Sequence, residues 1–169
     1  MRGTIGVESK VGVGSTFWIE LPHAEGQIDR HERNGDFINR EAESVVVGTL
    51  LYIEDNVSNI QLVEQILEMN RPQIRLITEM YGKSTVKLAT DYKPDMILLD
   101  LDLPDIHGSE VLKLLQREPI TKSIPVVVLS ADAMNSQIEK LMQAGADNYL
   151  TKPLEVLEFL RVVDEVMKK

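Results

Sequence analysis

Apolar and polar positions follow two different patterns along this chain, and the change comes near residue 45. From there on, short apolar runs of strand length alternate with segments whose apolar residues recur every three or four positions. The expected strands lie near 49–53, 73–78, 96–101, 124–130 and 148–150, and the expected helices around 60–67, 82–91, 108–117, 135–144 and 154–167. Five strand–helix repeats predict a parallel sheet with right-handed crossovers and helices on both faces.

The first part of the chain, residues 1–22, is predicted to form a β-hairpin. Thr4–Glu8 and Ser15–Leu21 are typical of two short strands around a glycine-containing loop, with Phe17 and Ile19 on one face. A hairpin alone is only marginally stable in water, so we expect the edge of a sheet whose other strands are absent. Residues 23–44 are polar, mixed in charge and without an apolar period, which predicts a linker over residues 23–47.

One apolar run, within MILLDLDLPDIHG at 96–108, leads directly into two carboxylates. Asp100 and Asp102 follow the run, and a Pro-Asp turn and a glycine come next, which predicts a buried parallel strand ending in a functional loop. Open α/β sheets carry their sites at such strand ends. A buried carboxylate there needs an ion pair, a metal or hydrogen bonds, because burying it alone is costly.

Polar residues at the other strand ends are expected to meet Asp100. Glu54 and Asp55 follow the first strand, Ser130 ends the fourth and Lys152 follows the fifth. Three clustered carboxylates repel one another, and a hard divalent cation such as Mg²⁺ is the usual way to neutralise them. Lys152 and Ser130 are placed to hold the oxygens of an incoming phosphoryl group while Asp100 attacks as a nucleophile.

Composition narrows the classes of partner. The net charge is −9 and the isoelectric point about 4.8, which argues against nucleic acid and favours cations or basic protein surfaces. The chain has no cysteine, so disulfides and thiolate metal sites are excluded. Without an apolar run of membrane-spanning length or a signal-like start, we expect a cytoplasmic location and no membrane contact by this chain.

Four pieces of the sequence in combination, YIEDN, LLDLDLP, VVLSADA and YLTKP, resemble the response-regulator receiver domain over residues 48–169. The resemblance implies a doubly wound, five-stranded, flavodoxin-like (βα)5 fold and a phosphoacceptor in a two-component phosphorelay. It also implies that Asp100 is the phosphoacceptor and that Mg²⁺ is held directly by Asp55, through water by Glu54 and by the backbone carbonyl of Asp102. Lys152, in a cis bond with Pro153, is implied to be the phosphate-binding lysine. Ser130 is implied to be the switch hydroxyl and Tyr149 the aromatic switch.

The first 22 residues, which include GTIGVESKVGVGSTFWIELP, resemble the C-terminal end of the ATP-binding domain of sensor histidine kinases, with its last glycine-rich box at 12–17. The other boxes of that domain are missing, so no kinase activity is expected, only self-catalysed phosphoryl transfer and autodephosphorylation. Together the two resemblances imply the C-terminal fragment of a hybrid histidine kinase. The implied partner is a histidine kinase or a histidine phosphotransfer protein, and a homodimer is left open.

The same residues suggest two alternatives to a receiver function. A haloacid-dehalogenase-like phosphatase would also use Asp100 and Asp102, as nucleophile and acid. The order of motifs argues against it, because here the acidic pair comes first and Pro104 replaces the usual hydroxyl or branched residue. The second alternative is a docking module that is never phosphorylated, and no missing residue supports it.

Several single residues also have plain structural interpretations. Taken alone, Ser130 is more typical of a helix cap or turn, and Lys152 of a solvated lysine. Half-buried packing of Tyr149 is as good an explanation as a switch role. Three methionines are expected at core positions of helices and need no cofactor: Met134, Met142 and Met167.

Overall fold

The structure is a computed structural model, and it describes residues 4–10, 12, 14–20, 46–131 and 134–168. The chain divides into two compact units, Met1–Glu43 and Ser44–Lys169, and each is described here by itself. Residues 23–45 of the predicted linker lie outside the described residues.

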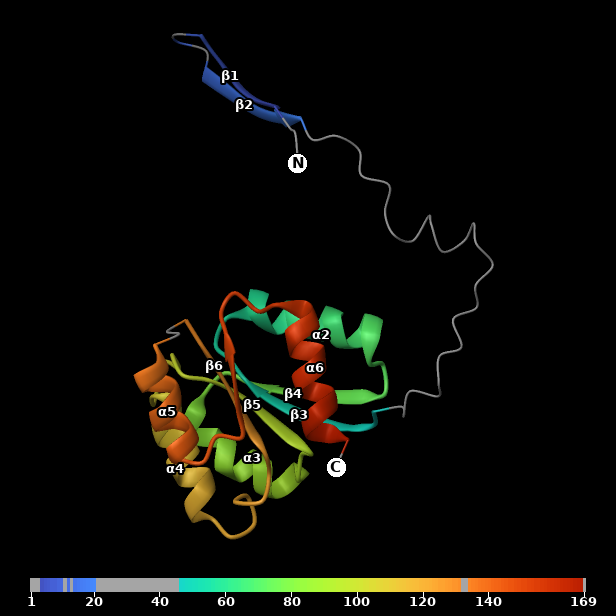
Figure 1. The fold of residues 1–169 in the computed structure, drawn as a ribbon, viewed down its shortest axis with the longest axis vertical. Coiled ribbons are helices and arrows are strands. Elements are labelled where there is room, and N and C mark those ends of the chain that lie inside the picture. Colours follow the sequence, from blue (N-terminus) through green and yellow to red (C-terminus); the bar gives the residue numbers. More distant parts are fainter. Residues whose placement is uncertain (1–3, 11, 13, 21–45, 132–133, 169) are drawn as a thin grey trace, which may run out of the picture. The chain divides into compact units, whose positions relative to one another are not determined.

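The first unit contains the predicted hairpin (Figure 1). Strands β1 (Thr4–Lys10) and β2 (Gly14–Glu20) pair antiparallel, from Thr4 opposite Glu20 to Lys10 opposite Gly14. Gly12 and Gly14 at the turn have φ of +80° and +136°, which glycine adopts without strain. The large apolar side chains of the hairpin are exposed, because two strands cannot build a core. They are Ile5, Val7, Phe17, Trp18 and Ile19.

The second unit is a five-stranded parallel sheet with helices on both faces, as predicted. Its strands lie in the order β4-β3-β5-β6-β7. The strands are β3 (Gly48–Ile53), β4 (Ile74–Glu79), β5 (Met96–Asp100), β6 (Val126–Ser130) and β7 (Asn148–Thr151). The helices are α2 (Val57–Asn70), a 3-10 turn η1 (Gly82–Ser84) running into α3 (Thr85–Tyr92), α4 (Gly108–Arg117), α5 (Asn135–Gln143) and α6 (Val156–Met167).

Two hydrophobic clusters fill the two sides of the sheet. Helices α2 and α6 cover one face, and α3, α4 and α5 cover the other (Figure 1). Alternation along β3 sends Leu50 and Tyr52 into the first cluster and Leu51 and Ile53 into the second. Strand β5 is central and buried along its whole length, as its continuous apolar run predicts.

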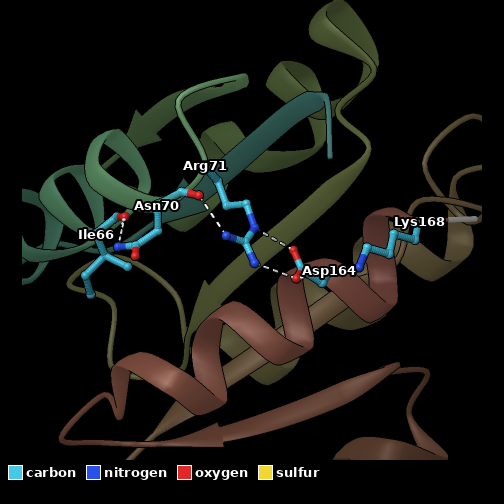
Figure 2. Close-up of polar contacts among 5 residues, drawn as sticks. All are labelled: Ile66, Asn70, Arg71, Asp164 and Lys168. Carbon is cyan, nitrogen blue, oxygen red and sulfur yellow. Dashed lines mark hydrogen bonds and ion pairs between the residues drawn. The ribbon is translucent and has the colours of Figure 1, made fainter. Parts of the chain in front are cut away.

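An ion pair joins the two helices that cover the first face. Arg71, at the C-terminal end of α2, donates from Nε to Oδ1 of Asp164 at 2.8 Å and from Nη2 to Oδ2 at 2.6 Å (Figure 2). Nη1 of Arg71 also donates to the carbonyl oxygen of Asn70 at 2.7 Å. Asp164 belongs to α6, so this two-pronged contact ties residues 93 positions apart in the sequence.

Some sequence-based boundaries and placements were wrong. The last helix begins at Val156 and not at Leu154, because Glu155 has extended backbone while Leu154 packs against the core from the preceding loop. Met134 and Met142 are 62% and 42% exposed, because α5 buries mainly Leu141. Met167 does pack against the first cluster, as predicted. Within the described residues, no helix is long and apolar enough to cross a membrane.

Candidate functional site

Polar residues from four neighbouring strands come together at the carboxyl end of the sheet. They are Glu54 and Asp55 after β3, Asp100 at the end of β5, Ser130 at the end of β6 and Lys152 after β7. The parallel register brings these ends level, with Ser130 opposite Thr151 and the backbone N–H of Lys152 donating to the carbonyl of Ser130 at 2.9 Å. The sheet therefore assembles residues that are far apart in sequence, as its topology requires.

Three carboxylates form the acidic part of this site. One oxygen of each of Glu54, Asp55 and Asp100 lies within 4.8 Å of the other two. Glu54 and Asp100 are buried, whereas Asp55 reaches solvent. The cluster therefore has two fixed, desolvated members and one accessible member at its mouth.

Lys152 pairs with both buried carboxylates. Its Nζ lies 2.8 Å from Oε2 of Glu54 and 2.9 Å from Oδ1 of Asp100. Burial alone would lower the pKa of Lys152, but hydrogen bonds and charges from these two carboxylates outweigh it, so its pKa is raised. Burial would likewise raise the pKa of Glu54, but the hydrogen bond and charge of Lys152 hold that pKa below its usual value.

Asp100 is the least well satisfied member of the group. It is 1% exposed, and its Oδ1 accepts no hydrogen bond of good geometry, although Nζ of Lys152 lies close to it. Burial raises the pKa of Asp100 and the charge of Glu54 raises it further, while Lys152 acts in the opposite direction. We call this Oδ1 oxygen orphaned, because it lacks a hydrogen bond of good geometry. Among the described residues, the cluster contains three carboxylates and only the ammonium of Lys152 to balance them, so it is short of positive charge. The donor set is therefore one that a hard divalent cation fits.

Tyr52 is a member of this group that the sequence-based reasoning missed. Its hydroxyl donates to Oε2 of Glu54 at 2.9 Å inside the protein. Burial and the charge of Glu54 raise the pKa of Tyr52 far above its usual value, so the hydroxyl stays protonated and acts as a donor. Residues two apart on a strand share a face, but Glu54 follows the end of β3, so the sequence pattern alone does not pair the two side chains. The backbone N–H of Asn56 donates to the other oxygen of Glu54, at 3.2 Å.

Close backbone contact brings α4 against the end of β5. The N–H of Gly108, the first residue of α4, donates to the carbonyl of Leu101 at 2.9 Å. A Cβ on Gly108 would lie 2.3 Å from the carbonyl oxygen of Asp100 and 2.8 Å from Cα of Leu101. Only glycine leaves room for this approach, so Gly108 helps to fix the backbone that carries Asp100.

The remaining predicted site residues lie near this edge with different surroundings. Ser130 is buried, and Tyr149 on β7 is partly buried against the second cluster. The side chain of Asp102 is exposed, but its backbone N–H bonds to the carboxylate of Asp100. The peptide bond between Lys152 and Pro153 is cis, as the resemblance implies.

The sequence of the second unit matches a known protein family. Residues 50–164 match the response regulator receiver domain. The chain belongs to this family. The match confirms the predicted doubly wound fold and the predicted function as a receiver. It does not extend to the hairpin, whose resemblance to a kinase domain stays a prediction.

Individual relatives agree with this assignment. The polar-differentiation response regulator DivK of Brucella anthropi is 31% identical over 115 residues, which are 68% of this chain and 92% of DivK. The receiver domain of sensor histidine kinase PA1611 from Pseudomonas aeruginosa, solved with a magnesium ion coordinated in its active-site cleft, is 26% identical with a TM-score of 0.65. That comparison covers 73% of this chain and 99% of the other.

A phosphorylated receiver is also among the similar structures. The phosphorylated cyanobacterial phytochrome response regulator RcpA is 28% identical, with a TM-score of 0.60, over 73% of this chain and 95% of RcpA. The fold of this chain is therefore shared with a structure that carries the phosphoryl modification.

Proposed function

We propose that Asp100 of this receiver accepts a phosphoryl group from a phosphohistidine. The observation that carries the proposal is the environment of Asp100: a buried carboxylate with an orphaned oxygen, between Lys152 on one side and the acidic pair on the other. The ammonium of Lys152, 2.9 Å from Oδ1, is placed to compensate the charge of a group transferred to Asp100.

Mg²⁺ is the cation that we assign to the acidic cluster. Asp55, Asp100 and the backbone carbonyl of Asp102 would hold it directly, and Glu54 would hold it through water. The support is the set of three oxygen donors within 4.8 Å of one another, together with the magnesium ion named for the Pseudomonas relative. When bound, the ion supplies charge neutralisation for the transferred phosphoryl group.

The proposed transfer requires an in-line exchange of bonds at phosphorus. A carboxylate oxygen of Asp100 forms the new P–O bond while the bond from phosphorus to the imidazole nitrogen of the donor histidine breaks. The imidazole leaves with the bonding electron pair and takes up a proton from solvent. Lys152, already 2.9 Å from Asp100, turns its ammonium to the phosphoryl oxygens, which carry the developing charge.

The response to phosphorylation is assigned to the neighbouring strands. Ser130, the last residue of β6, would donate its hydroxyl to a phosphoryl oxygen, and Tyr149 on β7 would turn inward behind it. The register that pairs β6 with β7 supports this coupling, because Val128 lies opposite Tyr149 and Ser130 opposite Thr151. A shift at Ser130 would then be passed on through the adjacent strand.

We infer that residues 1–22 are the C-terminal end of a kinase ATP-binding domain. The chain of 169 residues would then be part of a hybrid histidine kinase. The exposed apolar residues of the hairpin support this, because such a surface belongs against further sheet or core. The partners of the receiver would then be a histidine kinase or a histidine phosphotransfer protein.

Intact mass spectrometry after incubation with acetyl phosphate and Mg²⁺ tests the proposal. The protein should gain one labile phosphoryl group, Asp100→Asn should gain none, and Asp102→Asn, the matched control two residues away, should still be labelled. Absence of labelling in the wild type, or labelling of Asp100→Asn at the wild-type level, would overturn the assignment.

A further inference from the structure

Oε2 of Glu54 has two donors in this structure, and the proposed chemistry removes one of them. Lys152 lies 2.8 Å from Oε2 and Tyr52 donates to the same atom at 2.9 Å. When the phosphoryl group sits on Asp100, its oxygens compete with Glu54 for the lysine ammonium. A buried carboxylate that loses its ammonium partner is strongly destabilised unless other donors remain.

We propose that Tyr52 is a positioning residue of the phosphoryl site: its hydroxyl holds Oε2 of Glu54 in place when Lys152 turns to the phosphoryl oxygens. The inference rests on the proposed function and names a residue to which that function gives no role. Tyr52 can do this because it is 1% exposed and its ring is fixed in the first core cluster. It therefore presents its hydroxyl from a rigid support, whereas Lys152 has a flexible stem.

Two asparagines also donate to the Glu54 carboxylate. The N–H of Asn56 donates to Oε1, and the side chain of Asn59 also bonds to the Glu54 carboxylate. Beside the network lies a cavity of about 130 Å³. Its wall contains no charged residue other than Lys152, within the part of the chain that the structure describes. Tyr52 is thus a donor that the structure places on Oε2 itself and that remains there when Lys152 turns away.

The test compares two tyrosine-to-phenylalanine variants. Tyr52→Phe keeps the core ring and removes only the hydroxyl. Tyr92→Phe is the matched control, because Tyr92 on α3 is 48% exposed and its ring lies beside Arg75, 5.9 Å from the guanidinium carbon, outside the site. For each protein, two affinities are measured: that for Mg²⁺ alone, and that for beryllofluoride, a mimic of the phosphoryl group, at saturating Mg²⁺. Thermal unfolding establishes that each variant is folded.

The two affinities should respond differently to Tyr52→Phe. Beryllofluoride binding should weaken about tenfold, since the complex loses a hydrogen bond to a charged group that has no lysine. Mg²⁺ affinity should change by less than about threefold, since Lys152 still holds Glu54 in that state. Tyr92→Phe should match the wild type in both. An unchanged beryllofluoride affinity, or an equal loss in both affinities, would overturn the positioning role.

A measurement on the wild type needs no substitution. The hydroxyl proton of Tyr52 should stay protected from exchange in NMR spectra when beryllofluoride binds, and its loss of protection would contradict the proposal. Failure of the wild type to bind beryllofluoride would instead refute the receiver chemistry and the role of Tyr52 with it. Normal wild-type binding with an unaffected Tyr52→Phe would refute the role of Tyr52 alone.

Discussion

Replacing Asp164 by asparagine is expected to weaken the attachment of α2 to α6. The wild-type carboxylate accepts two hydrogen bonds from Arg71, at 2.8 and 2.6 Å, and both side chains are largely shielded, at 26% and 19% exposure (Figure 2). Paired contacts of this kind are stronger than single surface ion pairs, because the planar guanidinium matches both oxygens. Lys168 lies 3.7 Å from Oδ2 and adds a weaker attraction.

The size of the effect follows from what asparagine keeps. Its amide oxygen still accepts one hydrogen bond from Arg71, so the loss is the second bond and the charge, about 1–2 kcal/mol after allowing for partial solvent screening. For a unit of this size, that loss lowers the melting temperature by roughly 4–8 °C. Asp91→Asn, which breaks the exposed pair with Lys87, is the matched control and should leave the denaturation midpoint unchanged.

The contribution of Asp164 should also depend on pH. The hydrogen bond and charge of Arg71 lower the pKa of Asp164 in the folded state. A lowered pKa means that the stabilisation is complete above the unfolded pKa, about 3.9, and is lost as the pH falls through the folded pKa. Urea denaturation of wild type and Asp164→Asn between pH 7 and pH 3 measures it. A difference that is absent at pH 7, or one that persists undiminished at the acid end, would refute the reasoning.

Three further predictions concern the site. Asp55→Asn should weaken Mg²⁺ binding at least tenfold, because it removes a charged oxygen donor. Titration calorimetry measures this affinity, and an Mg²⁺ affinity equal to that of the wild type would contradict the metal assignment. Gly108→Ala should destabilise the protein by about 1–3 kcal/mol and lower the rate of labelling by acetyl phosphate, because the added methyl group meets the backbone of Asp100; normal stability and labelling would contradict this close fit. Ser130→Ala should be labelled yet show no change at Tyr149 in NMR spectra, and a wild-type shift there would remove Ser130 from the switch.

Much of the fold could be predicted because buried strands and helices have recognisable patterns of apolar residues in the sequence. Strand β5 and helix α4 were placed correctly, since one is a continuous apolar run and the other begins at a glycine and shows a helical apolar period. Errors came where an apolar residue packs without belonging to a regular element, as Leu154 does, or where a helix buries little of its surface, as α5 does around Met134 and Met142.

The site could be predicted as a set of residues but not as a network. Parallel topology forces Asp100, Glu54 and Lys152 to one edge of the sheet, so their proximity followed from the order of elements. The hydrogen bond from Tyr52 could not be foreseen in the same way, because a strand tyrosine is ordinarily core packing and its hydroxyl partner depends on side-chain geometry. The approach of Gly108 to Asp100 likewise depends on the loop conformation.

The most direct test of the central claim is the position of the phosphoryl group. Wild-type protein labelled with acetyl phosphate and Mg²⁺ is trapped with borohydride, which reduces the aspartyl phosphate to homoserine, and the modified peptide is mapped by mass spectrometry. The structure predicts the modification at Asp100, the buried carboxylate with an orphaned oxygen beside Lys152. Modification of Asp102 or Asp55 in its place would contradict the account.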